Sequence, residues 1–317
     1  MPESYFKGSL VALVTPFQGN GELDLLAFKN LVDWHAEIGT DAIVCCGTTG
    51  ENPTLTPEEQ LLIFRTAVDV ARKRVPIIAG TGTYDTLRSV EETEKAKALG
   101  VDGCLVVVPY YNRPTPEGVL AHFKALSSVG LPMIVYYHPA RTGLTLSAKI
   151  LADVCQLPSV VGLKEASGTL EMISEFKQYS SLPVFAGDDT LAYALMEQGA
   201  IGVISIVANI IPREWKLFTQ SFLKGEQEYA RTISDYFHPL CESLVVETNP
   251  QGIKHALSLM KRCQPYLRLP LVQPRPETKS LIEKRMRELQ LLERSFLDLF
   301  IDKTKSASCQ TSSFSDD

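Results

Sequence analysis

Val160-Val161-Gly162-Leu163-Lys164 is an apolar run that ends in a lysine. Continuous apolar runs of this length are typical of strands buried on both faces of a parallel sheet. Burial there removes water from an ammonium group and lowers the pKa of a lysine from about 10.4, and the neutral amine can form a Schiff base. Taken alone, the segment is better explained by a lysine that extends into water, with Glu165 as a screened neighbour. The rest of the chain reverses that preference.

The same kind of run recurs along the chain, and a helical pattern follows each occurrence. Successive runs begin about 20 to 35 residues apart, the length of a strand with its crossover helix. Eight such units in series predict a closed (β/α)8 TIM barrel. A doubly wound open sheet is the competing architecture, and the lack of a GxGxxG motif after the first run weakens it. The predicted strands are Gly8–Val14, Asp41–Cys46, Val75–Gly80, Gly103–Val108, Pro132–Tyr137, Val160–Lys164, Pro183–Gly187 and Gly202–Ile206.

Helical periodicity fills the segments between these strands. Pro57, Pro116 and Pro212 stand where a first helical turn tolerates proline, and Thr56 and Thr115 are candidate N-caps. The predicted helices of the barrel are Leu23–Ile38, Pro57–Arg74, Thr86–Leu99, Pro116–Val129, Ser147–Gln156, Leu170–Tyr179, Leu191–Gln198 and Pro212–Leu223.

The chain after the eighth unit is organised differently. Its last residues are rich in Ser, Thr, Lys and Asp and are predicted to be disordered. We expect a catalytic barrel over residues 1–224, a C-terminal helical region over 225–301 and a disordered tail over 302–317. The helices predicted in the C-terminal region are Glu226–Leu244, Asn249–Arg262 and Glu277–Ile301.

Composition excludes several classes of protein. The chain has 317 residues, 45% of them hydrophobic, which is ample material for a core. The net charge of −6, with no stripe dense in Lys and Arg, argues against a nucleic-acid surface. No apolar stretch is long enough to span a bilayer, and the N-terminus does not resemble a secretion signal. The 7 cysteines form no CxxC motif, so we expect reduced thiols in a cytoplasmic protein.

Functional groups of a (β/α)8 barrel collect at the carboxyl ends of its strands. The predicted strand ends carry hydroxyl groups at Thr48, Thr49, Tyr111 and Tyr136, in addition to the lysine. Schiff-base chemistry moves protons several times, so a hydroxyl relay beside the amine is useful. The backbone N–H groups of residues 47–50 can anchor the carboxylate of a keto acid.

Each of these features also has a simpler explanation. Residues 47–50 fit an ordinary tight loop, and an isolated tyrosine usually belongs to the core. Asp188 and Asp189 could be a metal pair, but acids favoured by the dipole of the following helix explain them better. His138 shows no metal-ligand spacing. Arg141 is either an ordinary surface residue or a residue whose guanidinium binds a second carboxylate.

Taken together, the strand ends resemble those of a known family. The sequence is similar to the dihydrodipicolinate synthase / N-acetylneuraminate lyase family of pyruvate-dependent class I aldolases, in order and spacing, from about residue 8 to residue 271. The motifs that carry the resemblance are Gly8–Pro16, Gly47–Glu51, Ala79–Gly82, Pro109–Pro114, Pro139–Gly143, Gly162–Gly168, Gly187–Asp189 and Gly202–Ser205.

The resemblance implies four catalytic residues. Lys164 would form the Schiff base with pyruvate, Tyr136 would shuttle protons at its carbonyl, and Thr48 would link Tyr136 to Tyr111 in a relay. The family's counterpart of Tyr111 reaches into the active site of a neighbouring subunit. A dimer is therefore implied as the minimal unit, and a homotetramer built as a dimer of dimers as the usual assembly.

Four more residues are implied to bind substrates. Thr49 would hold the carboxylate of pyruvate, and Arg141 would receive the carboxylate of the second substrate, L-aspartate 4-semialdehyde. Gly187 and Ile204 would shape the pocket through backbone contacts. The implied reaction joins the two substrates and opens the diaminopimelate–lysine biosynthesis pathway. No metal or organic cofactor is implied, because the lysine supplies the electron sink.

Two other functions stay open. A keto-sugar aldolase such as N-acetylneuraminate lyase keeps the same lysine and tyrosine, although Arg141 has less purpose opposite a polyhydroxylated aldehyde. A catalytically silent barrel that binds a ligand is disfavoured by the intact set of Lys164, Tyr136, Thr48 and Tyr111. The pair Tyr137-His138 replaces the family's usual Asn-Val or Asn-Ile, so the second-substrate site is less well defined than the Schiff-base step.

A second departure concerns regulation. Family members inhibited by lysine hold it in a polar cluster at a subunit interface, and the matching positions are Pro57 or Gln60, Tyr84 and Arg88. The ammonium of a lysine effector would meet a cation at Arg88, which is unfavourable. We therefore predict weak or absent inhibition by lysine.

Overall fold

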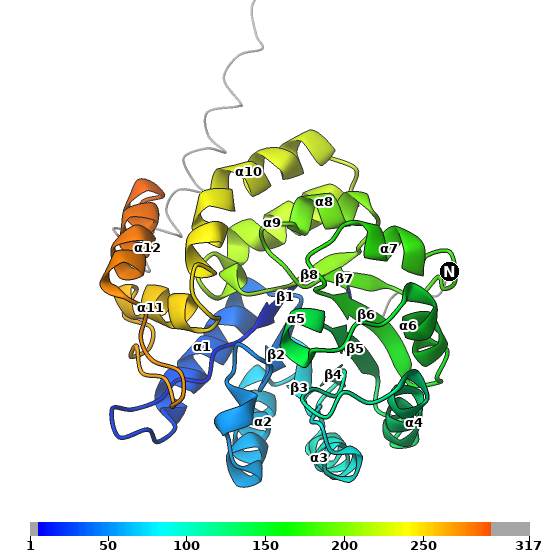
Figure 1. The fold of residues 1–317 in the computed structure, drawn as a ribbon. Helices are drawn as coiled ribbons and strands as arrows, with labels where there is room; N and C mark the ends of the chain where they lie inside the picture. The colour runs from blue at the N-terminus through cyan, green and yellow to red at the C-terminus, as the bar shows by residue number, and fades with distance from the viewer. Residues whose placement is uncertain (1–5, 293–317) are drawn as a thin grey trace, which may run out of the picture.

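The computed structural model of this protein describes residues 6–292. Its parallel strands pair in chain order, and β1 pairs with β8 to close the barrel (Figure 1). The predicted (β/α)8 fold is confirmed, and each strand lies within its predicted segment except β6, which continues to Glu165. The strands are β1 (Gly8–Ala12), β2 (Ala42–Cys45), β3 (Ile77–Gly80), β4 (Gly103–Val107), β5 (Met133–Tyr137), β6 (Val160–Glu165), β7 (Val184–Ala186) and β8 (Gly202–Ser205).

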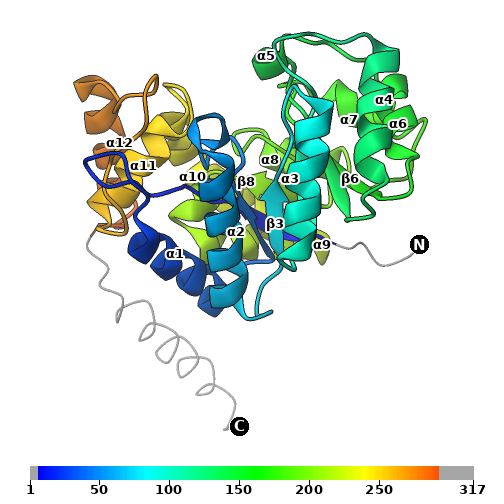
Figure 2. The same ribbon diagram turned by 90° about the horizontal axis from the view of Figure 1, so that it is seen from below.

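Helices surround the barrel and cover the outer face of its sheet (Figures 1 and 2). The predicted barrel helices are all present, with their observed bounds inside the predicted segments. Three short helices were not predicted, because a single turn leaves no periodicity to detect: η1 (Asn52–Thr54), α5 (Pro139–Thr142) and η2 (Val207–Asn209). The outer helices are α1 (Leu25–Ile38), α2 (Pro57–Ala71), α3 (Thr86–Ala98), α4 (Pro116–Ser127), α6 (Ala148–Cys155), α7 (Glu171–Phe176), α8 (Ala192–Glu197) and α9 (Pro212–Leu223).

Local sequence signals set the helix starts. The Thr56 hydroxyl accepts the Glu59 N–H while the Glu59 carboxylate accepts the Thr56 N–H, a reciprocal capping box that begins α2. The Thr115 hydroxyl accepts the Gly118 N–H at the start of α4. Both predicted N-caps are therefore confirmed, and both helices begin where the proline that follows the cap suits a first turn.

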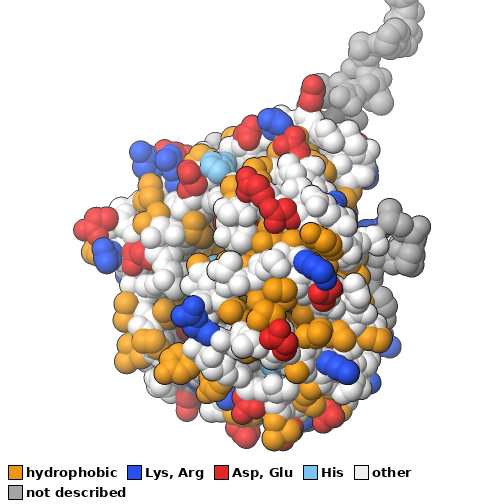
Figure 3. All heavy atoms as spheres, turned by 45° about the vertical axis from the view of Figure 1, so that its right-hand side comes forward, with side chains coloured by type: hydrophobic (Ala, Val, Ile, Leu, Met, Phe, Trp, Pro, Cys, Tyr) orange, Lys and Arg blue, Asp and Glu red, His pale blue; other side chains and the backbone are white. Residues whose placement is uncertain are grey.

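The apolar side chains form two layers. One fills the barrel interior and includes Leu10, Leu105, Tyr136 and Phe185, and the other lies between the sheet and the surrounding helices. Both faces of each strand are covered, so successive side chains are buried on either face, and this explains why the strands are continuous apolar runs in the sequence. Acidic and basic side chains are interspersed on the face shown in Figure 3, without a continuous basic stripe.

A helical extension follows the barrel and packs beside α1 and α9, away from α4 and α6 (Figures 1 and 2). It consists of α10 (Gln227–Leu244), α11 (Gln251–Leu259) and α12 (Pro276–Glu288). The last helix was predicted to reach residue 301, but α12 ends at Glu288. Residues 302–317, predicted as a disordered tail, lie outside the described residues, and the division at 224 stays a prediction. Among residues 6–292, none of the helices is both long and apolar enough to cross a membrane.

A buried ion pair ties this extension to the barrel. Lys254 of α11 pairs with Glu51, which follows β2, and both side chains are almost fully enclosed. The Lys254 ammonium also donates to the carbonyl oxygen of Tyr266 at 2.8 Å and lies 4.1 Å from the centre of the Phe17 ring. The Glu51 carboxylate accepts the backbone N–H of Arg268 at 3.0 Å. The extension is thereby fixed to the end of the loop that carries Thr48 and Thr49.

Replacing Lys254 with methionine tests this attachment. The Lys254→Met variant leaves a buried carboxylate at Glu51 without its cation, so we expect a loss of about 3 to 5 kcal/mol and a melting temperature lower by roughly 10 °C. Lys149→Met is the matched control, because its pair with Asp153 is exposed and contributes about 0 to 1 kcal/mol. Differential scanning calorimetry of both variants measures the difference, and equal melting temperatures would contradict a structural role for the buried pair.

Candidate active site

A cavity of about 370 Å³ lies at the carboxyl ends of the strands. The residues that line it come from several elements, including β5, β6, the loops after β2 and β7, and the segment between α10 and α11. Six of the eight residues implied to be catalytic or to bind substrates line it: Thr48, Thr49, Tyr136, Arg141, Lys164 and Gly187. Residues separated by more than a hundred positions thus meet in one space, as expected for the functional end of a (β/α)8 barrel.

Lys164 is buried at the end of β6, with only 6% of its surface exposed. Its Nζ atom lies 4.3 Å from the centre of the Tyr136 ring, and the two residues face each other in the β5–β6 register. Desolvation lowers the pKa of Lys164 to about 8, and the charge of Arg141 adds to this, while Asp189 and Asp188 oppose it. At pH 7 about one amine in ten is then neutral, against roughly one in three thousand at an ordinary lysine pKa. The sequence-based alternative of a solvated lysine is excluded.

Gly187 makes room for this lysine. A Cβ at Gly187 would lie 3.0 Å from the Lys164 Cε atom and 2.7 Å from the Ala166 Cβ atom. Any larger residue would push the lysine stem out of its place beside Tyr136. Steric crowding therefore explains why a glycine suits position 187, in addition to the backbone contacts proposed for it.

Tyr136 is buried in the barrel interior beside the lysine. Desolvation raises the pKa of its hydroxyl, while the charge of Arg141 and a hydrogen bond with Thr48 act in the opposite direction. The hydroxyl therefore keeps its proton at neutral pH and can donate it to a carbonyl oxygen. Thr48 and Tyr136 both line the cavity, and the relay between them that the family resemblance implied stays a prediction.

Thr49 is buried in the loop after β2, and a distant residue orients it. The Asn249 side-chain N–H donates to the Thr49 hydroxyl oxygen at 3.0 Å, which leaves the hydroxyl proton available to an anion. The backbone oxygen of Asn249 also accepts from the Arg141 guanidinium at 3.5 Å. Asn249 lines the cavity and was missed as a site residue in the sequence, where it was only the first residue of a predicted helix.

Asp188 and Asp189 line the cavity, and both accept hydrogen bonds from neighbouring loop residues. One Asp189 oxygen accepts the backbone N–H groups of Ile206 and Val207, at 2.8 and 2.7 Å, and so caps η2. Asp188 accepts from the N–H and hydroxyl of Thr190. Both acids precede α8, yet their side chains satisfy loop backbone rather than its first turn. The described residues contain no group of three His, Cys, Asp or Glu that could hold a metal ion.

Two predicted site residues lie outside this cavity. Ile204 is buried in β8 with its side chain in the barrel interior. Tyr111 follows β4 with φ at 69°, and 88% of its surface is exposed. A tyrosine in this conformation is uncommon and costs free energy unless its surroundings require it. In the single chain, Tyr111 therefore faces outward and does not complete the relay.

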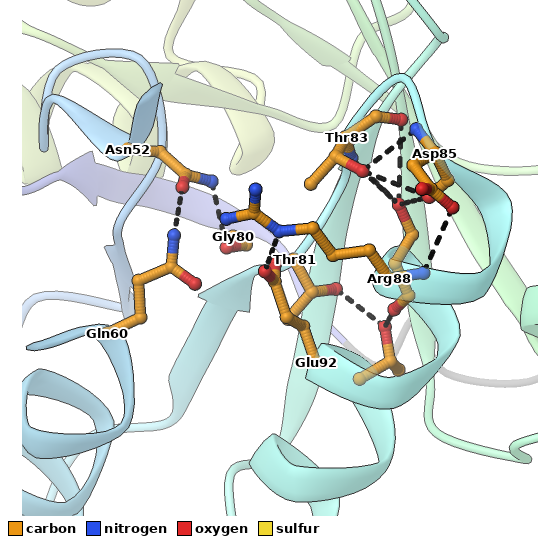
Figure 4. A network of polar contacts seen from close by, with 10 residues as sticks. Asn52, Gln60, Gly80, Thr81, Thr83, Asp85, Arg88 and Glu92 are labelled. Carbon is orange, nitrogen blue, oxygen red and sulfur yellow. Dashed lines mark hydrogen bonds and ion pairs between the residues drawn. The ribbon is translucent and has the colours of Figure 1, made fainter. Parts of the chain in front are cut away.

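The positions matched to a lysine effector lie beside a second cavity of about 200 Å³, which Tyr110 and Asn52 line. Figure 4 shows this region: Asn52 accepts from Gln60 and donates to the carbonyl oxygen of Gly80 at 3.2 Å. The Arg88 Nε atom donates to the Glu92 carboxylate at 2.6 Å.

The sequence argument considered the charge of Arg88 without its neighbour Glu92. Glu92 stands one helical turn further along α3 and neutralises much of the charge. Repulsion between Arg88 and an ammonium effector is therefore weaker than assumed. Weak inhibition by lysine stays a prediction.

The fold and these groups define a class of enzyme. A (β/α)8 barrel with a buried lysine of lowered pKa, beside a tyrosine hydroxyl, is the arrangement of a Schiff-base aldolase. A sequence model of the Dihydrodipicolinate synthetase family matches residues 5–289, and the chain belongs to this family.

Named relatives agree with this assignment. The chain is 40% identical to a 4-hydroxy-tetrahydrodipicolinate synthase of Syntrophus aciditrophicus, over 90% of this chain and 99% of that protein. It is 44% identical to a protein of the same name from Coxiella burnetii, over 84% and 92% of the two chains. The crystal structure of dihydrodipicolinate synthase from Aquifex aeolicus aligns with a TM-score of 0.88 at 41% identity, over 90% of this chain and 99% of that one.

Proposed function

We propose that this protein condenses pyruvate with L-aspartate 4-semialdehyde, the reaction of a 4-hydroxy-tetrahydrodipicolinate synthase. The observation that carries the proposal is the enclosed amine of Lys164 beside the Tyr136 ring, with a pKa of about 8. Relatives named for this activity match almost their whole length at 40% and 44% identity. The keto-sugar alternative is not favoured, since these relatives carry the synthase name.

Capture of pyruvate is the first half of the reaction. The neutral Lys164 amine attacks the keto carbon, water leaves, and the resulting iminium is the electron sink that allows a methyl proton to depart. Tyr136 donates to and accepts from the reacting oxygen as the carbinolamine forms and collapses. The Thr49 hydroxyl, oriented by Asn249, holds the carboxylate together with backbone N–H groups.

Addition to the second substrate follows. The enamine carbon attacks the aldehyde carbon. The amino group of the acceptor then attacks the imine carbon and displaces Lys164, and the proton that its ammonium form loses passes to the departing Lys164 amine. Arg141 binds the acceptor carboxylate at the cavity mouth, where its charge already acts on Lys164 and Tyr136. These steps require no metal or organic cofactor.

Tyr111 serves a neighbouring subunit in this proposal. Its exposure and positive φ in the single chain support a contact that only a second copy supplies. The copy would receive the Tyr111 hydroxyl next to its own Thr48, completing the relay to Tyr136. The proposed assembly is a homotetramer made of two such dimers.

A panel of acceptor aldehydes tests the function. With pyruvate held constant, the protein should turn over L-aspartate 4-semialdehyde faster than N-acetylmannosamine. Lys164→Ala should lower kcat by at least about a thousandfold, because the covalent intermediate cannot form. Lys149→Ala, which changes an exposed lysine, is the control and should leave kcat unchanged. Faster turnover of N-acetylmannosamine, or activity that survives in Lys164→Ala, would overturn the proposal.

Mixing two inactive variants tests the role of Tyr111. Chains carrying Lys164→Ala and chains carrying Tyr111→Phe are combined under conditions that exchange subunits. A mixed dimer then contains one site with both Lys164 and Tyr111, so random pairing should restore roughly a quarter of the wild-type activity. If Tyr111 acted within its own chain, mixing would restore nothing.

A further inference from the structure

His138 lines the main cavity and has no role in the mechanism above. It follows Tyr137, the last residue of β5, and stands directly before the short helix α5. Its backbone oxygen accepts the N–H groups of Arg141 and Thr142, at 3.0 and 3.1 Å. These bonds fix the imidazole close to the residue proposed to bind the acceptor carboxylate.

Charges of both signs act on the ring. The charges of Arg141 and Lys164 lower its pKa and that of Asp188 raises it, and the ring centre lies 6.0 Å from that of Tyr136 in an edge contact. Desolvation, reinforced by the two cations, lowers the pKa of His138 to about 4. The imidazole is therefore neutral at physiological pH and offers one N–H donor and one lone pair.

One nitrogen of this ring has no hydrogen-bond partner. The Nδ1 atom is buried, and none of the residues 6–292 bonds to it. Enclosure of Nδ1 leaves Nε2 as the nitrogen that can contact a molecule in the cavity. Asp188 also lines the cavity: Thr190 donates twice to its Oδ1 atom, and Oδ2 has no hydrogen-bond partner among the described residues.

We infer that His138 and Asp188 form the subsite for the amino group of the acceptor aldehyde, which makes His138 a specificity-determining residue. The inference rests on the proposed function, in which the acceptor carries both a carboxylate and an ammonium group. Arg141 takes the carboxylate, and the ammonium then lies toward the Asp188 carboxylate and the lone pair of His138. A neutral imidazole suits this place, because an imidazolium would repel the ammonium and compete for Asp188.

The same arrangement explains discrimination against acceptors without an amino group. An ammonium bound by a carboxylate and an imidazole satisfies both partners, whereas an acceptor with hydrogen at that position leaves them unpaired. Sites built to bind a polar group reject the analogue that lacks it by large factors, because buried polar groups are then unsatisfied. An apolar residue at position 138 would abolish the preference for acceptors with an amino group and would leave formation of the Schiff base unchanged.

Two variants and two acceptors test the inference. His138→Leu removes the ring nitrogens, and His138→Gln keeps a donor and an acceptor at similar reach. L-Aspartate 4-semialdehyde is compared with succinate semialdehyde, the same aldehyde acid without the amino group, by the rate of pyruvate consumption. For His138→Leu we expect kcat/KM to fall roughly 10- to 100-fold with the first acceptor and less than about threefold with the second. His138→Gln should recover most of the loss.

Pyruvate trapping provides the control for folding and for the first half-reaction. Both variants should form the reduced pyruvate adduct at the wild-type rate, since His138 does not contact pyruvate in this proposal. Equal losses with both acceptors, or no loss with either, would overturn the assignment of His138. Failure of the wild-type protein to condense pyruvate with L-aspartate 4-semialdehyde would instead overturn the proposed function, and the inference with it.

Discussion

Desolvation of a single ammonium group is the constraint around which the active end of this barrel is arranged. The stem of Lys164 lies beside the Tyr136 ring, in space that stays free because Gly187 has no side chain, and the residue is buried. Asp188 and Asp189 limit how far the pKa falls, and Arg141 offsets part of their effect. The resulting pKa of Lys164, about 8, leaves a useful fraction of the amine neutral at pH 7 while the amine stays basic enough to accept a proton.

The C-terminal extension is part of the site. Asn249 orients the Thr49 hydroxyl and contacts Arg141, so one residue outside the barrel sets both proposed carboxylate anchors. The Lys254–Glu51 pair fixes the same loop from its other end. Removing the extension would therefore disturb substrate binding even if the barrel stayed closed.

The sequence predicted the strands, the outer helices and the N-caps at Thr56 and Thr115, because each depends on local periodicity or on a few neighbouring residues. It did not predict α5 or the role of Asn249, whose contact with Thr49 spans 200 positions and exists only once the chain has folded. The pairing of Arg88 with Glu92 was missed although its i,i+4 spacing was visible. Exposure of Tyr111 in the single chain agrees with its family role but needs a second subunit to be tested.

The most direct measurement is the pH dependence of covalent pyruvate capture, followed by peptide mass mapping after reduction with cyanoborohydride. The neutral amine is the reacting form, so the initial rate should rise with pH, reach half its maximum near pH 8, level off above about pH 9 and place the adduct on Lys164. Lys254, the other buried lysine among residues 6–292, should stay unmodified because its side chain is fully enclosed and pairs with Glu51. A rate that climbs to about pH 10, as for an ordinary lysine, or an adduct located elsewhere, would contradict the account.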